Sequence, residues 1–239
     1  MNQIINRNTK FIDLGLIDYK EAWDYQTNLF NATLEIKAGN RSLPLSEQLP
    51  TNNYLIFCEH PHVFTLGKSG DEKNLLIKEE NLHTINASYY PINRGGDITY
   101  HGPGQLVVYP VIDLENFFTD IHKYMRLLEE SVIQTLREFN VESGRISGLT
   151  GVWLGSENEN NVRKICALGV KTSRWVTLHG LAFNVNPNLD YFNYIVPCGI
   201  EDKAVTSLER ELAHKVGMTQ VKLILKEKIA SIFEMALVH

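Results

Sequence analysis

The amino-acid sequence predicts an α+β fold, in which helices pack on a mixed β-sheet. Two segments with apolar residues at helical spacing lie far apart in the chain, at residues 121–139 and 221–237. Apolar runs with the length of strands lie between them, and three of these runs follow one another after residue 150. No internal repeat is visible, which argues against a repeat architecture.

We expect the 239 residues to form a single domain, 1–239, because no Pro/Gly/Ser-rich linker or run of charges divides them. A hydrophobic share of 44% with 21% charged residues is typical of a globular protein that buries a sizeable core. Residues 1–10 are polar, and no run of about 18 uncharged apolar residues occurs. Neither a signal peptide nor a membrane span is therefore predicted.

The charge and the cysteine count exclude further classes of protein. A formal net charge of -5 disfavours general nucleic-acid binding, although it leaves room for a local basic rim that faces an acidic partner. Three widely spaced cysteines fit neither a disulfide framework nor a paired set of zinc ligands. A reducing, cytoplasmic location is the expectation.

The N-terminal part of the chain predicts a strand, a helix and a long loop. Phe11–Leu16 is a short apolar stretch, and Asp18 is placed to cap a helix whose side chains from Ala22 to Leu29 share one face. We expect this helix to reach Lys37. Residues 39–53 are rich in Gly, Pro, Ser and Asn, which predicts a flexible loop.

The next elements are strands around a glycine-rich turn. Tyr54–Cys58 and Tyr89–Ile92 have the composition of strands, and the second leads into the turn Arg94–Asp97. Gln105–Ile112 predicts a buried strand that Pro110 interrupts, because proline cannot donate to a β-ladder. Between the turn Arg94–Asp97 and the strand that begins at Gln105 we expect an irregular loop.

A helix after Asp120 is the most strongly patterned element of the chain. Its apolar residues recur at helical spacing, and the helix should end near Gly144. These residues are Ile121, Tyr124, Met125, Leu128, Val132, Ile133, Leu136 and Phe139.

Three successive strands and a last helix complete the prediction. Gly151–Leu154, Lys164–Lys171 and Gly180–Val185 are expected to form an antiparallel meander, with the polar insertion 156–161 after the first strand. Val221–Leu237 fits a helix.

Of the three cysteines, Cys58 and Cys166 lie in apolar strand contexts, where a thiol usually acts as a small hydrophobe. Cys198 differs, because Pro197 and Gly199 remove it from regular structure and leave room for a substrate to approach. Cys198 is therefore the candidate nucleophile, although its local sequence fits a structural loop cysteine equally well.

The segment Arg94–Gln105 contains four glycines, an arginine and a histidine in twelve positions. A wide loop with positive φ angles would explain the glycines, but we favour the wall of a pocket whose backbone approaches a ligand. No Gly-Lys-Ser/Thr follows, and Gly-x-Gly-x-x-Gly is missing, so the segment is neither a Walker loop nor a dinucleotide turn. Phosphate binding lacks support.

Four histidines are candidates for binding roles. His60 and His62 flank a proline in an extended piece, where alternation would turn both to one face, but no further zinc ligands follow at a recognisable spacing. We predict that this pair is structural and fixes a turn. His101 and His179 each precede glycine, and each could hydrogen-bond either a substrate carbonyl or the neighbouring backbone.

A cysteine nucleophile reacts as the thiolate, which needs a base or a positive charge nearby. Lys164 and Lys171 bracket one predicted strand. Their odd separation places them on opposite faces, so that only one readily points into a given pocket. Spacing does not choose between the two, and a strand lysine is usually a solvated edge group.

Four blocks of sequence together resemble one family. They are Glu59–Gly67, Arg94–Gln105, Lys164–Val170, and a fourth block that runs from His179–Val185 through Pro197–Gly199 to Val205–Leu208. In order and spacing they cover the chain from about Tyr54 to Glu211, and the second block is the most diagnostic. The chain resembles the lipoyl(octanoyl) transferase family, the octanoyltransferases of lipoate biosynthesis.

The resemblance implies a fold like the catalytic domain of biotin and lipoate protein ligases. It implies an acyl thioester on Cys198 and a tuning role for Lys164, which opens the Lys-Ile-x-x-hydrophobic-Gly strand. His179 is a further candidate. The acyl-binding walls would be Arg94, Gly95, Gly96, Asp97, Ile98, Thr99, Tyr100 and His101, with Ala167, Leu168 and Gly169, and with Gly180, Leu181 and Ala182.

The implied reaction moves an octanoyl or lipoyl group from acyl carrier protein to a lysine, and it requires no cofactor, ATP or metal. The implied partners are octanoyl-acyl carrier protein, the lipoyl domains of 2-oxoacid dehydrogenase E2 subunits and the glycine cleavage H protein, with no nucleic acid and no membrane. Residues 39–53 and 156–161, and Cys166 where alanine is commoner, depart from the family pattern. These departures bear on partner docking and not on the chemistry.

Two alternatives come from other classes of function. The first is an ATP-dependent lipoate or biotin protein ligase on the same fold, which would activate a free acid and would not require Cys198. The second is a non-catalytic protein that binds an acyl group or a carrier domain in the same pocket.

Overall fold

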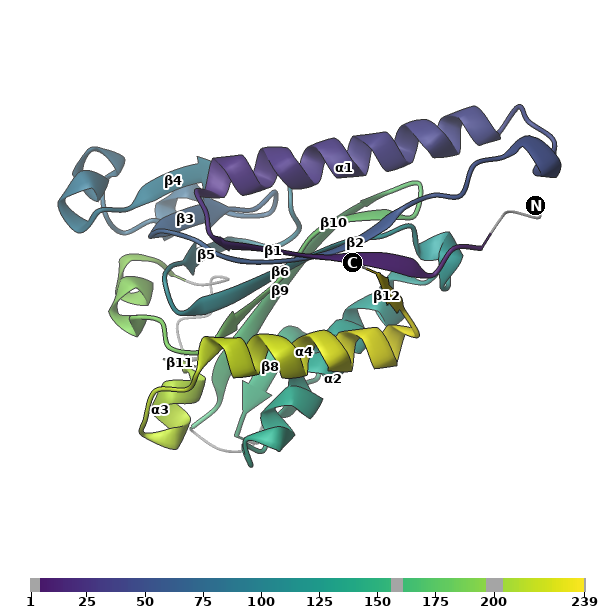
Figure 1. The fold of residues 1–239 in the computed structure, drawn as a ribbon. Helices are drawn as coiled ribbons and strands as arrows, with labels where there is room; N and C mark the ends of the chain where they lie inside the picture. Colours follow the sequence, from purple (N-terminus) through teal and green to yellow (C-terminus); the bar gives the residue numbers. More distant parts are fainter. Residues whose placement is uncertain (1–4, 156–160, 197–203, 239) are drawn as a thin grey trace.

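The computed structural model describes residues 5–155, 161–196 and 204–238. A mixed β-sheet runs through the middle of the molecule, with one long helix along one face and two helices along the other (Figure 1). The predicted α+β class is confirmed.

The main sheet has nine strands in the order β12-β1-β2-β6-β10-β9-β8-β7, and β11 pairs with β9 beside this path. β1 is parallel to β2 and β12, whereas the steps from β2 to β7 are antiparallel. The predicted meander is confirmed as β8, β9 and β10. The strand bounds are Asn8–Leu16 (β1), Asn53–Glu59 (β2), Gln105–Val111 (β6), Gly144–Ile146 (β7), Leu149–Leu154 (β8), Arg163–Ser173 (β9), Val176–Asn184 (β10), Ala204–Val205 (β11) and Ala236–Val238 (β12).

Four α-helices lie in the described residues, and each face of the sheet has its own apolar core. The predicted cap at Asp18 is confirmed, since its side chain accepts hydrogen bonds from the amides of Lys20 and Glu21. Asp120, after which the second helix was expected, accepts one from the amide of Lys123 and caps that helix. None of the described helices is both long and apolar enough to span a bilayer. The bounds are Tyr19–Asn40 (α1), Ile121–Glu138 (α2), Leu208–Leu212 (α3) and Met218–Phe233 (α4), with short 3-10 helices at Leu45–Glu47, Glu72–Asn74, Glu79–Ile85, Leu114–Asn116 and Leu189–Tyr194.

A small second sheet has the order β4-β3-β5 and lies beside the start of α1 (Figure 1). Its strands are Val63–Leu66 (β3), Ser88–Pro91 (β4) and Ile98–His101 (β5). The prediction of an irregular loop throughout residues 94–105 is therefore wrong, because β5 pairs with β3 in that range. A strand of four residues between glycine-rich turns is too short to show a period of its own.

Three further predictions about element bounds are wrong. The helix after Asp120 ends at Glu138 and not near Gly144, because Asn140 adopts a left-handed φ of 56° and Gly144 begins β7. The last helix stops at Phe233 and not at Leu237, because Glu234 adopts a left-handed φ of 55° and the next residues pair with β1. Strand β6 continues through Pro110. The Thr177 hydroxyl donates to the Pro110 carbonyl at 2.7 Å and accepts from the Ile112 amide at 3.1 Å, which replaces the ladder bonds at that point.

The β9–β10 hairpin turns at Arg174 and Trp175, whose φ angles are 49° and 67°. Two consecutive left-handed residues form the tight connection that matches the twist of antiparallel strands. This turn sets the register in which Gly169 lies opposite Gly180, and Ala167 opposite Ala182.

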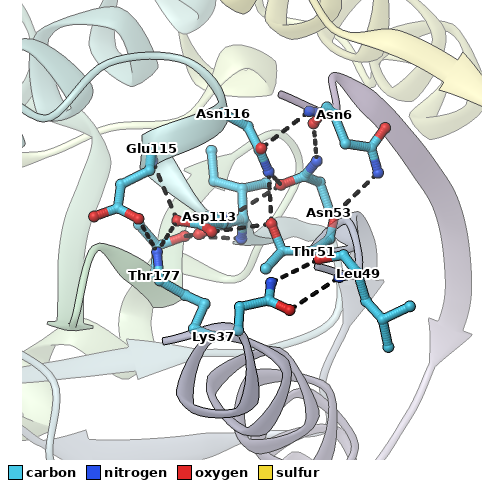
Figure 2. Close-up of polar contacts among 11 residues, drawn as sticks. Asn6, Lys37, Leu49, Thr51, Asn53, Asp113, Glu115, Asn116 and Thr177 are labelled. Carbon is cyan, nitrogen blue, oxygen red and sulfur yellow. Dashed lines mark hydrogen bonds and ion pairs between the residues drawn. The ribbon is translucent and has the colours of Figure 1, made fainter. Parts of the chain in front are cut away.

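A buried polar cluster ties α1 to the ends of β2 and β6 (Figure 2). The Asp113 carboxylate accepts from the Lys37 ammonium at 2.5 Å and from the Thr51 hydroxyl at 2.9 Å, and it is 1% exposed. The Asn40 side chain bonds both the amide and the carbonyl of Leu49. The predicted loop is therefore present after Asn40, later than the expected helix end at Lys37, and its flexibility stays a prediction.

Candidate active site

A cavity of about 510 Å³ lies between the glycine-rich segment and strands β6, β9 and β10. This volume is within the range of small-molecule sites. Most of the residues predicted for the site line it. They are Arg94, Gly95, Gly96, Asp97, Ile98, Thr99, His101, Lys164, Ala167, Leu168, Gly169, His179, Gly180, Leu181 and Ala182.

Tyr100 is the exception among the predicted wall residues that the structure describes, since it does not line the cavity. Side chains alternate along β5, so Thr99 and His101 face the cavity while Tyr100 points away. Its ring is buried against Phe64 and Phe192, and its hydroxyl bonds His62 Nδ1 at 2.8 Å. Tyr100 therefore supports the cavity wall from behind.

Glycines allow two backbones to meet at the cavity wall. The Gly95 amide donates to the Val170 carbonyl at 3.0 Å, which attaches the glycine-rich segment to β9. A Cβ atom on Gly169 would lie 2.9 Å from the Gly95 carbonyl oxygen, closer than normal packing allows. The contact between this segment and β9 thus depends on the absence of a side chain at Gly169.

A chain of hydrogen bonds fixes Arg94 in the wall. The Gln105 amide nitrogen donates to the Asn184 side chain at 2.9 Å and to the Tyr100 carbonyl at 3.1 Å, so its oxygen accepts from His101 Nδ1 at 2.7 Å.

His101 Nε2 is then an acceptor and faces the Thr65 hydroxyl at 3.5 Å. Arg94 donates to the Thr65 hydroxyl at 3.0 Å and to the Thr65 carbonyl at 2.7 Å. Arg94 is only 8% exposed. Burial lowers the pKa of His101 to about 3, and neighbouring His60 and Arg94 act in the same direction.

His60 and His62 do not share a face, contrary to the expectation from alternation. His60 is fully buried, its Nδ1 donates to the Ile17 carbonyl at 2.9 Å, and its Nε2 accepts from the Tyr109 hydroxyl at 2.8 Å. His62 instead stacks on Tyr191. Burial lowers the pKa of His60 to about 4. His60 therefore remains neutral and orients the Tyr109 hydroxyl at the cavity wall.

His179 lines the cavity from an unusual backbone conformation, with a φ of 63° inside β10. Its amide donates to the Gln26 side chain of α1 at 2.9 Å, and its Nε2 contacts the Asn93 side chain at 3.1 Å. Burial lowers the pKa of His179 to about 3, with a further contribution from the charge of Arg94. The ring is thus a neutral hydrogen-bonding group.

The two candidate lysines differ in what they contact. Lys164 lines the cavity, and its ammonium lies 4.5 Å from the ring centroid of Trp153. The Lys171 ammonium lies 5.8 Å from the ring centroid of Phe30 on α1, and Lys171 is not a lining residue. This arrangement agrees with the expectation that only one lysine points into the pocket.

Cys58 and Cys166 are both fully buried, and burial raises the pKa of each thiol. Neither lines the cavity. Cys198 lies outside the described residues. Phe192 and Val205, which flank Cys198 in the sequence, both line the cavity, and Val205 on β11 lies opposite Lys164.

Several lining residues were not predicted from the sequence, and two of them are the tyrosines Tyr19 and Tyr109. Tyr19 follows the capping Asp18, and Tyr109 lies within an otherwise apolar strand. A tyrosine in such a strand was an available signal, because its buried hydroxyl needs a partner. Gln105 lies in the segment that was predicted as a pocket wall, whereas the residues missed are Tyr19, Val107, Tyr109, Met125, Gly148, Leu149, Thr150, Trp153, Val170, Asn184, Phe192 and Val205.

No group of three or more His, Cys, Asp or Glu side chains in the described ranges is arranged to hold a metal ion. The polar lining groups include the guanidinium of Arg94, the lysine Lys164, two neutral histidines, tyrosine hydroxyls, the Asp97 carboxylate, and side-chain amides and hydroxyls. Such a set can hold a carbonyl group in an otherwise apolar cavity.

This chain belongs to the family of the lipoyl protein ligase A/B catalytic domain, whose model matches residues 18–230. It is 60% identical to an octanoyltransferase of Cytophaga hutchinsonii over 98% of this chain and 96% of that protein. It is 56% identical to an octanoyltransferase of Flavobacterium johnsoniae over 98% of this chain and 100% of that protein.

The fold is similar to that of a bipartite lipoate protein ligase from Thermoplasma acidophilum, with a TM-score of 0.70 at 16% identity. The alignment covers 97% of this chain and 86% of that chain. The predicted fold family is therefore confirmed.

Proposed function

We propose that this protein is an octanoyltransferase, which moves octanoyl or lipoyl groups from acyl carrier protein to a lysine of lipoyl domains. The proposal is supported by octanoyltransferases that are 56% and 60% identical to it over nearly the whole chain. The observation in the structure that carries the proposal is an apolar cavity with Lys164 at its wall and with Val205 opposite Lys164.

Cys198 is the proposed nucleophile. Its thiolate attacks the carbonyl carbon of the octanoyl thioester, the carrier thiolate leaves with a proton, and the octanoyl group becomes a thioester of Cys198. The amine of the acceptor lysine then attacks this thioester, loses a proton and forms an amide while the Cys198 thiolate is released. Exchange of one thioester for another is nearly balanced in energy, and amide formation from a thioester is downhill.

Lys164 is the proposed partner of Cys198. A positive charge near a thiol favours the thiolate, and a lysine near the reacting atoms can pass protons to the leaving thiol and from the incoming amine. Arg94, His101 and His179 line the same cavity as fixed polar groups. The Arg94 guanidinium is proposed to donate to the acyl carbonyl. The two imidazoles are proposed to hold neighbouring groups in place and not to exchange protons, since both have a pKa of about 3.

The acceptors are proposed to be lipoyl domains of 2-oxoacid dehydrogenase E2 subunits and the glycine cleavage H protein. The structure of the related ligase from Thermoplasma acidophilum was described together with its E2 lipoyl domain. Because acyl carrier protein and these acceptors are cytoplasmic partners, we propose the same location for this chain.

The decisive experiment measures the intact mass of the protein after mixing with octanoyl-acyl carrier protein. We expect an increase of one octanoyl group that hydroxylamine removes, and no increase for Cys198→Ala. Cys58→Ala and Cys166→Ala are the matched controls and should both be acylated. An adduct that persists in Cys198→Ala would refute the assignment of the nucleophile.

A second measurement separates this function from a ligase. Transfer from octanoyl-acyl carrier protein to a lipoyl domain should proceed without ATP and magnesium, because the donor is already a thioester. Transfer that requires ATP and uses free octanoate would establish a ligase instead. Binding of the acyl carrier protein without any transfer would identify a binding protein.

A further inference from the structure

We propose that the indole ring of Trp153 positions the ammonium group of Lys164 for acyl transfer through a cation–π interaction. This inference rests on the proposed function, and it assigns a positioning role to a residue that the reaction scheme does not otherwise use.

Trp153 and Lys164 are opposite one another on the neighbouring strands β8 and β9. The Lys164 ammonium lies 4.5 Å from the ring centroid of Trp153, and both residues line the cavity. A cation within about 6 Å of an aromatic centroid is attracted to the ring, and tryptophan is the strongest of the aromatic partners. The ring therefore favours one place for the ammonium and favours its charged form.

The backbone next to the pair is shaped for this contact. Gly151 has a φ of 130°, and a Cβ atom there would lie 3.3 Å from both Lys164 Cε and Trp153 Nε1. Its amide donates to the buried carboxylate of Glu129 at 3.0 Å. The register of β8 and β9 shifts between Val152 and Trp153, and such an irregularity re-aims a side chain.

Trp153 borders the cavity from a buried position. It is one of the buried hydrophobic residues of the described chain and is only 2% exposed. It lines the active-site cavity and also a second hollow of about 660 Å³ beside the end of α2. The ring is therefore held by its surroundings on the side of the cavity that the Lys164 side chain also lines.

The charged groups beside Lys164 include Arg163, the preceding residue on β9, and Arg94 and Asp97, which line the same cavity. A substitution at position 153 removes none of these charges. A comparison between variants at position 153 therefore isolates the contribution of the ring.

The first test measures the rate of Cys198 acylation against pH in single-turnover experiments. Trp153→Leu should lower the rate near pH 7 by about tenfold. Trp153→Phe keeps a ring and should restore most of this loss. Trp175→Leu, at the exposed hairpin turn, is the matched control and should resemble the wild type.

A double-mutant cycle distinguishes positioning from packing. In a Lys164→Ala background, Trp153→Leu should cause no further loss, because the group that the ring positions is already gone. If Trp153→Leu slows both backgrounds by the same factor, or if Trp153→Phe is as slow as Trp153→Leu, the ring acts only as packing and the proposal is wrong.

A direct measurement does not depend on acyl transfer. The side-chain signals of Lys164 can be observed by NMR in the lysine-labelled enzyme, with the signals assigned by their loss in Lys164→Ala. Because the ammonium lies 4.5 Å from the ring centroid of Trp153, we expect the ring to shift the signal of the Cε protons upfield in the wild type, and this shift to be absent in Trp153→Leu. A wild type without the upfield shift would overturn the proposal even in an active enzyme, and a wild type that takes up no octanoyl group would refute the proposed function alone.

Discussion

Gly180 lies in the middle of the main sheet, on strand β10 next to β6, and it lines the cavity. A Cβ atom at this position would lie 2.1 Å from the Val108 carbonyl oxygen and 2.7 Å from Pro110 Cδ. Both contacts are far inside normal packing distances, and the backbone of a central strand cannot move away. Glycine is thus required by close approach and not by an unusual backbone angle.

We expect Gly180→Ala to lower the free energy of unfolding by about 3 kcal/mol, because an overpacked core strains its surroundings. Urea unfolding followed by circular dichroism measures this loss. Gly39→Ala is the matched control, since nothing lies within 4 Å of its Cβ position in α1. That variant should be stabilised by about 0.5 kcal/mol, and equal effects at the two positions would contradict the argument.

The two lysines of β9 give a test of the catalytic pair. Lys164→Ala should slow acylation of Cys198 by at least about tenfold near pH 7, since the loss of a positioned acid or base typically costs a hundredfold or more. The defect should shrink toward pH 9, because alkali restores the thiolate that the lost charge no longer favours. Lys171→Ala, whose side chain contacts Phe30 instead, should show neither effect.

The measurement is the rate of octanoyl uptake by intact mass across this pH range. Equal losses in the two variants would remove Lys164 from the proposed pair. A Lys164→Ala defect that is the same at pH 7 and pH 9 would argue against an effect on the thiolate.

Among the elements, α1 is held at its far end by charge as well as by apolar packing. Lys37 contributes the cation of the cluster in Figure 2, and it also contacts Glu115 at 2.7 Å. Breaking a buried ion pair leaves one charge without its partner in a region of low polarity. The attachment of α1 to the sheet, and with it the place of Gln26 beside His179, depends on this cluster.

Asp113→Ala should therefore lower the free energy of unfolding by about 3 kcal/mol or more. Asp24→Ala is the control, because Asp24 pairs with Lys20 on the exposed side of the same helix and such pairs contribute less than about 1 kcal/mol. Chemical denaturation of both variants measures the two free energies of unfolding. Similar losses would mean that the buried cluster contributes no more than a surface pair.

Long elements were predicted from the sequence more accurately than short ones. The helix after Asp120 was predicted from a pattern of many turns, and its start and its buried face are as expected. Strands β3, β5, β7, β11 and β12 were missed, because two to four residues are too few to show alternation and their pairing is set by other parts of the chain.

The same limit applies to the site. The glycine-rich segment and the strands β9 and β10 were predicted, although β10 begins at Val176 and not at the predicted Gly180. Tyr19, Tyr109 and Trp153 are single aromatic residues in ordinary contexts. Tyr19 reaches the cavity from the start of α1, and Tyr109 and Trp153 reach it from strands of the main sheet, so their place depends on tertiary structure.

At the scale of the whole molecule, three buried imidazoles couple folding to pH. The pKa of His60 is lowered to about 4, and those of His101 and His179 to about 3, each mainly by burial. An unfolded histidine titrates near 6.5, so each of the three takes up a proton on unfolding below that pH. Their contribution to stability is present above pH 6.5 and is lost as the pH falls toward the folded values.

As the pH falls from 7 to 5, each of these histidines becomes protonated in the unfolded chain but stays neutral in the folded one. We expect each to lower the free energy of unfolding by on the order of 2 kcal/mol over this range. His101→Gln should reduce this pH dependence by one such contribution, whatever its effect at pH 7. Replacement of the exposed His83 by glutamine should leave the dependence unchanged. Urea unfolding at the two pH values measures the difference, and a pH dependence that is identical in His101→Gln would disprove a neutral buried ring.

The edge strands of the main sheet affect the tendency of the protein to aggregate at high concentration. In the described part of the chain, one margin is the three-residue strand β7 and the other is the three-residue strand β12. β12 covers Asn8–Lys10 of β1, and beyond it β1 has a register shift near Asp13, whose carboxylate pairs with Lys222. Edge strands that are short, irregular and charged pair poorly with a strand of another molecule. A nine-stranded sheet can therefore remain dispersed without a partner, and loss of residues 236–238 would turn β1 into a site for aggregation.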